Sequence, residues 1–199
     1  MTNILIVGLG GIGSWLVDKL AWLKEQGQLE DVEVDGYDHD MVEEKNTRYQ
    51  RFTVDDLYEN KATALDIRYD RDPRWFFSYG EKVVDTKIFD KYNLIVSAVD
   101  NLKFRKMLFQ ENNKKFDWID LRSEGRIIAA ITKHKENTDE KLMALVNGDL
   151  EAEGSCQLQA DLDEGRVQLG NQIVADIGAQ YILNWLRGIP LPPGFIHTF

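Results

Sequence analysis

Only one cysteine, Cys156, occurs in the 199 residues, and there are only four prolines. A single thiol excludes an internal disulfide framework and a paired-cysteine zinc site. The scarcity of proline and the lack of low-complexity runs argue against a disordered or fibrous chain. The longest apolar runs cover residues 4–7 and 127–131, far short of the ~20 residues that a membrane span needs. No basic region opens the chain, so we expect no signal peptide, no membrane association and a cytoplasmic protein.

Basic residues are outnumbered, since 24 Lys and Arg stand against 34 Asp and Glu, and the net charge is −10. A nucleic-acid partner requires clustered positive charge to neutralise its phosphates, so this balance argues against one. The chain does have enough apolar residues, 43% of the total, to bury a core. Its length is typical of one domain. We therefore predict a single domain over residues 1–199.

Apolar residues follow the periods of strands and helices in alternation. Unbroken apolar runs predict strands, and a spacing of three and four residues predicts helices, as for Ile12, Leu16 and Leu20. The predicted strands cover 3–7, 32–37, 82–85, 94–99, 116–121 and 125–132, and the predicted helices cover 12–27, a segment opened by Thr53, 102–112 and 174–185. Residues 141–146 fit either state, and residues 189–194 are expected to be extended. This order predicts an α/β doubly wound fold with a mostly parallel sheet, antiparallel later strands and helices on both faces.

Four glycines lie between the first predicted strand and the first predicted helix. Gly8, Gly10 and Gly13 form the pattern G-x-G-x-x-G, with Gly11 inside it. Glycines at these places allow a tight turn and a close approach to a pyrophosphate at the helix N-terminus, as in Rossmann-like folds. Asp38 follows at about the spacing of the acid that binds a ribose hydroxyl. The pattern predicts a nucleotide site without identifying the nucleotide, and a structural glycine turn is the alternative.

Further motifs follow in a fixed order along the chain. They are the run D-x-D-x-V-x-x-x-N from Asp38 to Asn46, the lysine-bearing segment 56–62, residues 97–101 with Arg105 four positions on, and residues 124–127. Each resembles a motif of the E1-like superfamily, the adenylyltransferases related to ThiF, MoeB and the ubiquitin-activating enzymes. The resemblance covers nearly the whole chain. It implies ATP and Mg²⁺ as cofactors.

A triphosphate beside the glycine loop needs cations and a carboxylate that anchors its metal. Lys61 at a helix start and either Arg48 or Arg51 can supply the cations, and plain surface solvation is the alternative. Asp100 comes directly after a buried strand, where it can hold Mg²⁺ and can also cap the next helix. The resemblance implies catalytic roles for Asp100, Lys61 and Arg48, and nucleotide-binding roles for Asp38, Asp40, Asn46, Arg51, Lys61, Asp100, Asn101 and the four glycines.

The sequence departs from the family pattern in several places. Tyr49 stands where the family has an arginine before the glutamine, with Arg48 and Arg51 on either side, and Tyr58 stands where it has a glycine. The paired CxxC motifs of many members are missing, so we expect no structural zinc. We also expect no arginine from a helix before the first strand to reach a partner subunit's ATP.

Cys156 lies in the acidic stretch 147–169, which reads as a long loop. The resemblance makes this stretch the crossover loop, where family members carry the cysteine that accepts the activated carboxyl group. A free cysteine is more often a small buried residue, but the Gly, Ser and Gln neighbours of Cys156 are not apolar. The acidic residues Glu153 and Asp161 on either side oppose thiolate formation. Both interpretations stay open.

The resemblance implies an ATP-dependent adenylyltransferase that activates a carboxylate. On family analogy this carboxylate is the C-terminal glycine of a ubiquitin-like or sulfur-carrier protein, possibly passed on to Cys156. An NAD(P)-dependent oxidoreductase is an alternative, although the second half offers no evident His or Tyr-Lys proton donor. An inactive E1-like partner subunit is another. Family members work in pairs and the helices carry aromatic residues, Trp22 among them, so we expect a homodimer.

Overall fold

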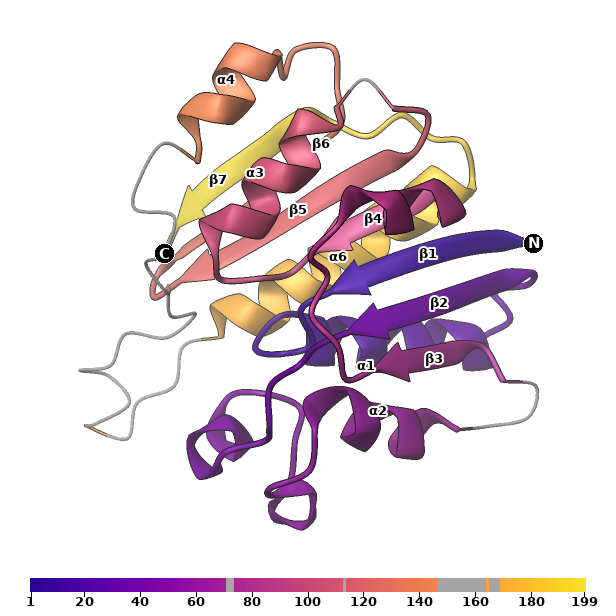
Figure 1. Cartoon of the computed structure of the whole chain (residues 1–199), viewed down its shortest axis with the longest axis vertical. Helices are drawn as coiled ribbons and strands as arrows, with labels where there is room; N and C mark the ends of the chain where they lie inside the picture. The colour runs from indigo at the N-terminus through magenta and orange to yellow at the C-terminus, as the bar shows by residue number, and fades with distance from the viewer. Residues whose placement is uncertain (71–73, 113, 147–163, 165–168) are drawn as a thin grey trace.

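The computed structural model describes residues 1–70, 74–112, 114–146, 164 and 169–199. Figure 1 shows a seven-stranded sheet in the order β3-β2-β1-β4-β5-β6-β7. β1 to β5 run parallel, and β6 and β7 are antiparallel additions. The strands are β1 (Thr2–Val7), β2 (Val32–Tyr37), β3 (Phe76–Tyr79), β4 (Leu94–Ser97), β5 (Asp117–Glu124), β6 (Ile127–Thr132) and β7 (Gly194–Thr198). The predicted fold class is confirmed, including the antiparallel later strands.

Helices cover both faces of the sheet (Figure 1). They are α1 (Gly13–Glu25), α2 (Lys61–Tyr69), α3 (Leu102–Gln110), α4 (Asp139–Ala144) and α6 (Gly170–Leu186), with 3₁₀ segments η1 (Glu44–Arg48), η2 (Val54–Asp56) and η3 (Thr86–Lys91). Ile4 and Ile6 of β1 join the core under α1, α2 and α6, whereas Leu5 and Val7 join the core under α3 and α4. β1 is therefore apolar at successive positions because both of its faces are covered. No helix in the described parts of the chain is long and apolar enough to cross a membrane.

The register of three neighbouring strands brings their carboxyl ends together. Val7, the last residue of β1, lies opposite Tyr37 at the end of β2 and opposite Ser97 at the end of β4. The residues that follow these three strands therefore emerge side by side at one edge of the sheet. Open α/β sheets bind their ligands at this edge, where the strand order reverses.

The predicted strand over 82–85 is wrong. The third strand is Phe76–Tyr79 instead, and Phe76 lies opposite Val34 of β2. Burial decides between the two segments, because Phe76 is 1% exposed whereas Val84 is 76% exposed. The valines at 83 and 84 have strand propensity but no neighbouring strand to pair with in the described structure.

Three other segments differ from or sharpen the sequence prediction. Thr53 does form the predicted capping box with Asp56, but it opens only the three-residue η2 rather than a helix. The α-helix of this region starts eight positions later at Lys61, where the side chain of Asn60 accepts hydrogen bonds from two backbone N–H groups. The ambiguous segment 141–146 lies largely in a helix, α4. β7 was not predicted.

Candidate functional site

The glycine loop is packed too closely for side chains at two positions. Gly8 has a φ of +89°, and a Cβ there would lie 2.7 Å from the carbonyl oxygen of Ala98. A Cβ at Gly13 would lie 1.9 Å from the carbonyl oxygen of Gly8. These two glycines therefore let the loop between β1 and α1 close tightly against the residue that follows β4. The structure thus places the loop at the shared edge of the sheet.

Asp38 joins the end of β2 to this loop. Its Oδ2 accepts a hydrogen bond of 2.7 Å from the backbone N–H of Leu9, and its Oδ1 accepts one of 2.9 Å from that of Asp40. The side chain is buried, and burial raises the pKa of Asp38 above its ordinary value of 3.8, although Lys61 and the backbone donors oppose this rise. The predicted ribose acid therefore lies directly beside the glycine loop.

Lys61 begins α2 with its side chain 9% exposed. Its Nζ lies 3.0 Å from Oδ2 of Asp40, which is half-exposed. Burial raises the pKa of Asp40, but the charge and hydrogen bond of Lys61, with smaller help from His39, outweigh it and lower that pKa below 3.8. A buried ammonium thus stands at the carboxyl edge of the sheet, where its partner can still be reached from solvent.

Two carboxylates and a histidine lie close together near this ammonium. One ligand atom each from Asp38, His39 and Asp40 lies within 4.8 Å of the others, a spacing that could hold a metal ion. Both oxygens of Asp38 already accept backbone N–H groups, and Asp40 already binds Lys61. The geometry therefore favours these carboxylates as partners of the Lys61 ammonium over a metal site.

The polar stretch after β2 serves structure more than the sequence predicted. Asn46 is buried, and its Oδ1 accepts the backbone N–H of Glu43 at 2.9 Å, which closes a capping box on η1. Tyr49, at the place of the family's arginine, is also buried, and its carbonyl accepts the indole N–H of Trp15 at 3.1 Å. Tyr49 therefore helps to hold α1 through this hydrogen bond.

The two arginines beside Tyr49 have different surroundings. Arg51 lies 3.0 Å from Asp18 of α1, and its guanidinium is 5.4 Å from the ring centre of Trp15. Arg48, at the end of η1, is exposed. A triphosphate would have to draw Arg51 away from Asp18, whereas Arg48 is open to solvent. Arg48 is thus the more accessible of the two arginines.

Gln50 is a site neighbour to which the sequence analysis gave no role. Its side-chain amide lies against the glycine loop, 3.7–3.8 Å from where a Cβ of Gly10 would be. Gln50 is 8% exposed, and its Oε1 has no hydrogen-bond partner in the structure as described. The glutamine of the family pattern, which Gln50 retains next to the departure at Tyr49, was the available sequence signal.

Asp100 and Asn101 follow β4. The sequence analysis allowed Asp100 both to hold a metal and to cap the next helix. Asn101 is the cap of α3, because its Oδ1 accepts the backbone N–H of Phe104 at 3.0 Å. Asp100 is exposed at the same edge of the sheet as the glycine loop. Since Asn101 performs the capping, the carboxylate of Asp100 is available for a metal or a ligand. Cys156 lies outside the described residues.

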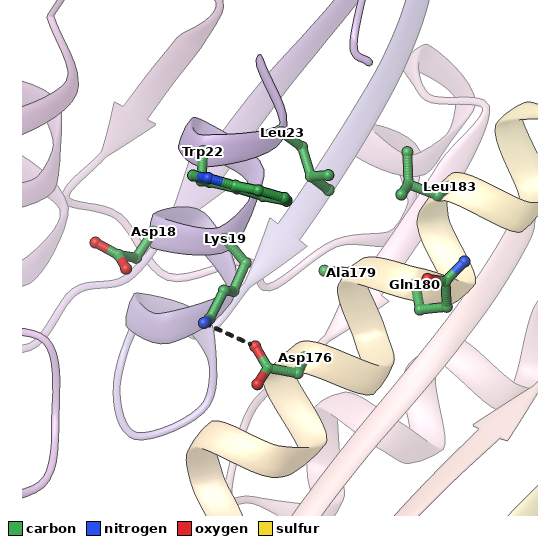
Figure 2. Close-up of a pocket in the computed structure, with 8 residues that line it drawn as sticks. All are labelled: Asp18, Lys19, Trp22, Leu23, Asp176, Ala179, Gln180 and Leu183. Carbon is green, nitrogen blue, oxygen red and sulfur yellow. Dashed lines mark ion pairs between the residues drawn. The ribbon is translucent and has the colours of Figure 1, made fainter. Parts of the chain in front are cut away.

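A surface pocket lies between α1 and α6 (Figure 2). Its volume is about 410 Å³, and Lys19 and Asp176 form an ion pair of 3.1 Å across it. Trp22 is 57% exposed there, so it is not a core residue. The lining residues are Asp18, Lys19, Trp22, Leu23, Asp176, Ala179, Gln180 and Leu183, and none of them is a predicted site residue.

Comparisons with known proteins support the fold. The chain superposes on a crystal structure of PaaA with a TM-score of 0.70 at 17% identity, over 100% of this chain and 61% of PaaA. For MccB of E. coli with ATP the TM-score is 0.65 at 18% identity, over 100% and 63%. For the tRNA N6-threonylcarbamoyladenosine dehydratase TcdA of E. coli it is 0.68 at 16% identity, over 94% and 86%. The chain thus spans less than two thirds of PaaA and MccB, and such identities show the shared fold alone.

No curated protein matches the chain closely enough to count as a relative. The family comparison is decisive, because the ThiF family matches residues 1–199, from the first strand through the glycine loop, Lys61 and Asp100 to the last strand. The chain belongs to the ThiF family.

Proposed function

We propose that this protein uses ATP to activate a carboxylate as an acyl-adenylate. The observation that carries the proposal is the buried ammonium of Lys61, held 3.0 Å from the half-exposed Asp40 at the edge of the sheet that carries the glycine loop. A cation there can exchange its carboxylate partner for a phosphate. Family membership and the structural likeness to MccB, which was crystallised with ATP, support ATP as the nucleotide.

In this reaction an oxygen of the substrate carboxylate attacks the α-phosphorus of ATP. The bond from the α-phosphorus to the bridging oxygen breaks, pyrophosphate leaves, and the acyl-adenylate forms. The chain's own residues act by holding and neutralising charge, as is usual for transfers at phosphorus. Asp38 would orient the ribose, and Lys61 with Arg48 would balance the phosphates, since both cations belong to segments at this edge.

Mg²⁺ fits this site through Asp100. The ion prefers one or two carboxylates together with phosphate oxygens and water, and Asp100 is an exposed carboxylate without a capping task. When bound, Mg²⁺ would neutralise charge on the departing pyrophosphate. Asp38 fits less well, because both of its oxygens already accept backbone N–H groups.

ATP–pyrophosphate exchange tests this proposal directly. Radioactive pyrophosphate should enter ATP in a manner that depends on the carboxylate substrate, which can be sought with peptides and small proteins that end in glycine. The oxidoreductase alternative predicts binding of NADH instead, visible as a change in its fluorescence. Exchange that stays absent with every carboxylate, together with NADH binding, would overturn the proposal. Absence of both would favour the inactive subunit.

The substrate that we propose is the C-terminal glycine of a ubiquitin-like or sulfur-carrier protein. The names of the similar structures mention different molecules, namely N-formylated MccA in complex with MccB and a tRNA nucleoside for TcdA, so proteins of this fold act with several classes of molecule. A carrier protein is favoured by the motifs that resemble the E1-like superfamily. Pyrophosphate exchange measured with a panel of carrier proteins, and compared with peptides and tRNA, discriminates among these classes.

Cys156 is our candidate for accepting the activated acyl group. Its thiolate would attack the acyl carbonyl, AMP would leave, and a thioester would remain. Cys156→Ser should keep pyrophosphate exchange within about threefold, because adenylation precedes this step. The same variant should lose any thiol-sensitive adduct with the carrier protein. If the wild type forms no such adduct, or if the serine variant loses exchange and stability together, Cys156 is not the acceptor.

A homodimer is our proposal for assembly. The exposed Trp22 and the pocket around it are consistent with a covered surface between α1 and α6. Light scattering at tens of micromolar should give twice the monomer mass of 23.0 kDa. A monomer at these concentrations would contradict the proposal.

A further inference from the structure

Asp120 is a fully buried carboxylate in the middle of β5, surrounded by donors from three elements. Its Oδ1 accepts hydrogen bonds from Oγ of Ser97 at 2.7 Å and from Nε of Arg105 at 3.1 Å. Its Oδ2 accepts one from Nε of Arg122 at 2.6 Å. Burying a charge is costly unless it is paired in this way, so such a group is expected to have a purpose in the fold.

Two of these donors lead to the segment that carries Asp100. Ser97 is the last residue of β4 and lies directly opposite Asp120 in the sheet. Arg105 of α3 turns back on its own helix start, and its second guanidinium nitrogen donates to the carbonyl of Val99 at 2.6 Å. Asn101, on the other side of Asp100, is fixed as the cap of α3.

The exposed Asp100 therefore stands between two anchored neighbours. Val99 is held through Arg105 to Asp120, and the N–H of Ala98 donates to the carbonyl of Val7 at 2.8 Å. Ala98 also forms the wall against which Gly8 packs. The same few contacts thus set the place of Asp100 and its position relative to the glycine loop.

We infer that Asp120 and Arg105 are positioning residues that hold Asp100 in place for adenylation. The planar guanidinium of Arg105 is required because it bonds Asp120 and Val99 at the same time, in a fork that one ammonium cannot reproduce. The catalytic consequence rests on the proposed function, whereas the anchoring of residues 98–101 does not. Arg122 binds the same carboxylate, but within the described structure it makes no hydrogen bond to residues 98–101, so it provides a matched control.

Amide hydrogen exchange tests the anchoring without any assay of activity. Arg105→Lys and Asp120→Asn should each speed exchange in the peptide containing residues 98–101 by at least about threefold, because that peptide loses its anchor. Arg122→Lys changes the same cluster by the same chemistry and should leave this peptide within about 1.5-fold of the wild type. Equal acceleration in Arg105→Lys and Arg122→Lys would overturn the anchoring.

A double-mutant cycle tests the link to catalysis. Arg105→Lys should lower kcat of ATP–pyrophosphate exchange by about 10- to 100-fold, with less change in the KM for ATP, because a displaced carboxylate fails in the transition state. In the Asp100→Ala background the same substitution should cost less than about twofold, since it acts through Asp100. Independent, multiplying effects would overturn the positioning role. A wild type without exchange would refute the proposed function alone, and the hydrogen-exchange result would still decide the anchoring.

Discussion

Two ion pairs in this protein have nearly the same distance and cation burial but differ in the exposure of their carboxylates. In the first, Lys61 is 9% exposed and its partner Asp40 is 53% exposed, at a distance of 3.0 Å. In the second, Arg105 is also 9% exposed, but its partner Asp120 is 0% exposed, at 3.1 Å. Distance and cation burial are therefore almost equal, and the exposure of the carboxylate is the difference.

That difference separates a pair that can change partners from one that cannot. A phosphate can replace Asp40 at Lys61, because the half-exposed Asp40 carboxylate can be solvated by water once it leaves the ammonium. Asp120 is enclosed by Ser97, Arg105 and Arg122 and is not exposed, so water or a ligand cannot take the place of one of these donors. The first pair suits a ligand site, and the second suits a support beneath one.

The largest expected effect concerns the exchangeable pair and its catalytic neighbour. Lys61→Ala and Asp100→Ala should each lower ATP–pyrophosphate exchange by at least ~10²-fold, because each removes a charge placed for the transferring phosphates. Lys45→Ala is the matched control, since Lys45 is 61% exposed and pairs with Glu43 on the surface. Exchange near the wild-type rate in both site variants would remove these residues from the catalytic machinery.

Stability should show the opposite ranking of the two pairs. Asp120→Asn should lower the free energy of unfolding by about 3–5 kcal/mol, because two guanidinium groups then lack a buried counter-charge. Asp40→Asn should change it by no more than about 1 kcal/mol, since its carboxylate is half-exposed and Asp38 still faces Lys61. Urea unfolding of both variants measures the difference. Equal losses would mean that exposure does not separate the pairs.

Asp40 and Lys61 could each be proposed as site residues from the sequence, although not as a pair, because residues of this site follow local signals. Gly13, Asp38 and Lys61 come directly at strand ends or helix starts, and the register of parallel strands then brings them together. Asp120 gave no local signal, because its meaning lies in the cross-strand contact with Ser97 and in a helix that returns over the sheet. Its place between Ile119 and Leu121 within a predicted strand was the available hint.

Fold errors have the same origin in contacts between distant segments. β7 pairs Gly194 with Ile131, across 62 intervening residues, and a Pro- and Gly-containing tail does not look like a strand in isolation. The segment 82–85 shows the reverse, since strand propensity without a partner produced no strand. Which of Asp100 and Asn101 caps α3 likewise depends on the hydrogen bond between the Asn101 side chain and the backbone of Phe104, which the sequence alone does not show.

The smallest expected effect distinguishes two carboxylates that lie two residues apart. Burial raises the pKa of Asp38 above 3.8, whereas Lys61 outweighs burial at Asp40 and lowers its pKa. For Asp38 the folded state holds the proton more tightly than the unfolded chain, so ionisation costs stability and the cost disappears as pH falls through the raised pKa. For Asp40 the charged form contributes stability above 3.8, and this contribution is lost as pH falls through the lowered pKa.

Unfolding in urea at a series of pH values resolves these opposite signs. Measured against Asp38→Asn, the wild type should gain free energy of unfolding as pH falls from about 7 to about 4, because protonation relieves the buried charge. Measured against Asp40→Asn, it should change little over that range and lose stability only below 3.8. Parallel curves for the two comparisons would show that Lys61 does not discriminate between the carboxylates. The interpretation that Lys61 pairs with Asp40 rather than with Asp38, and exchanges Asp40 for a phosphate, would then be wrong.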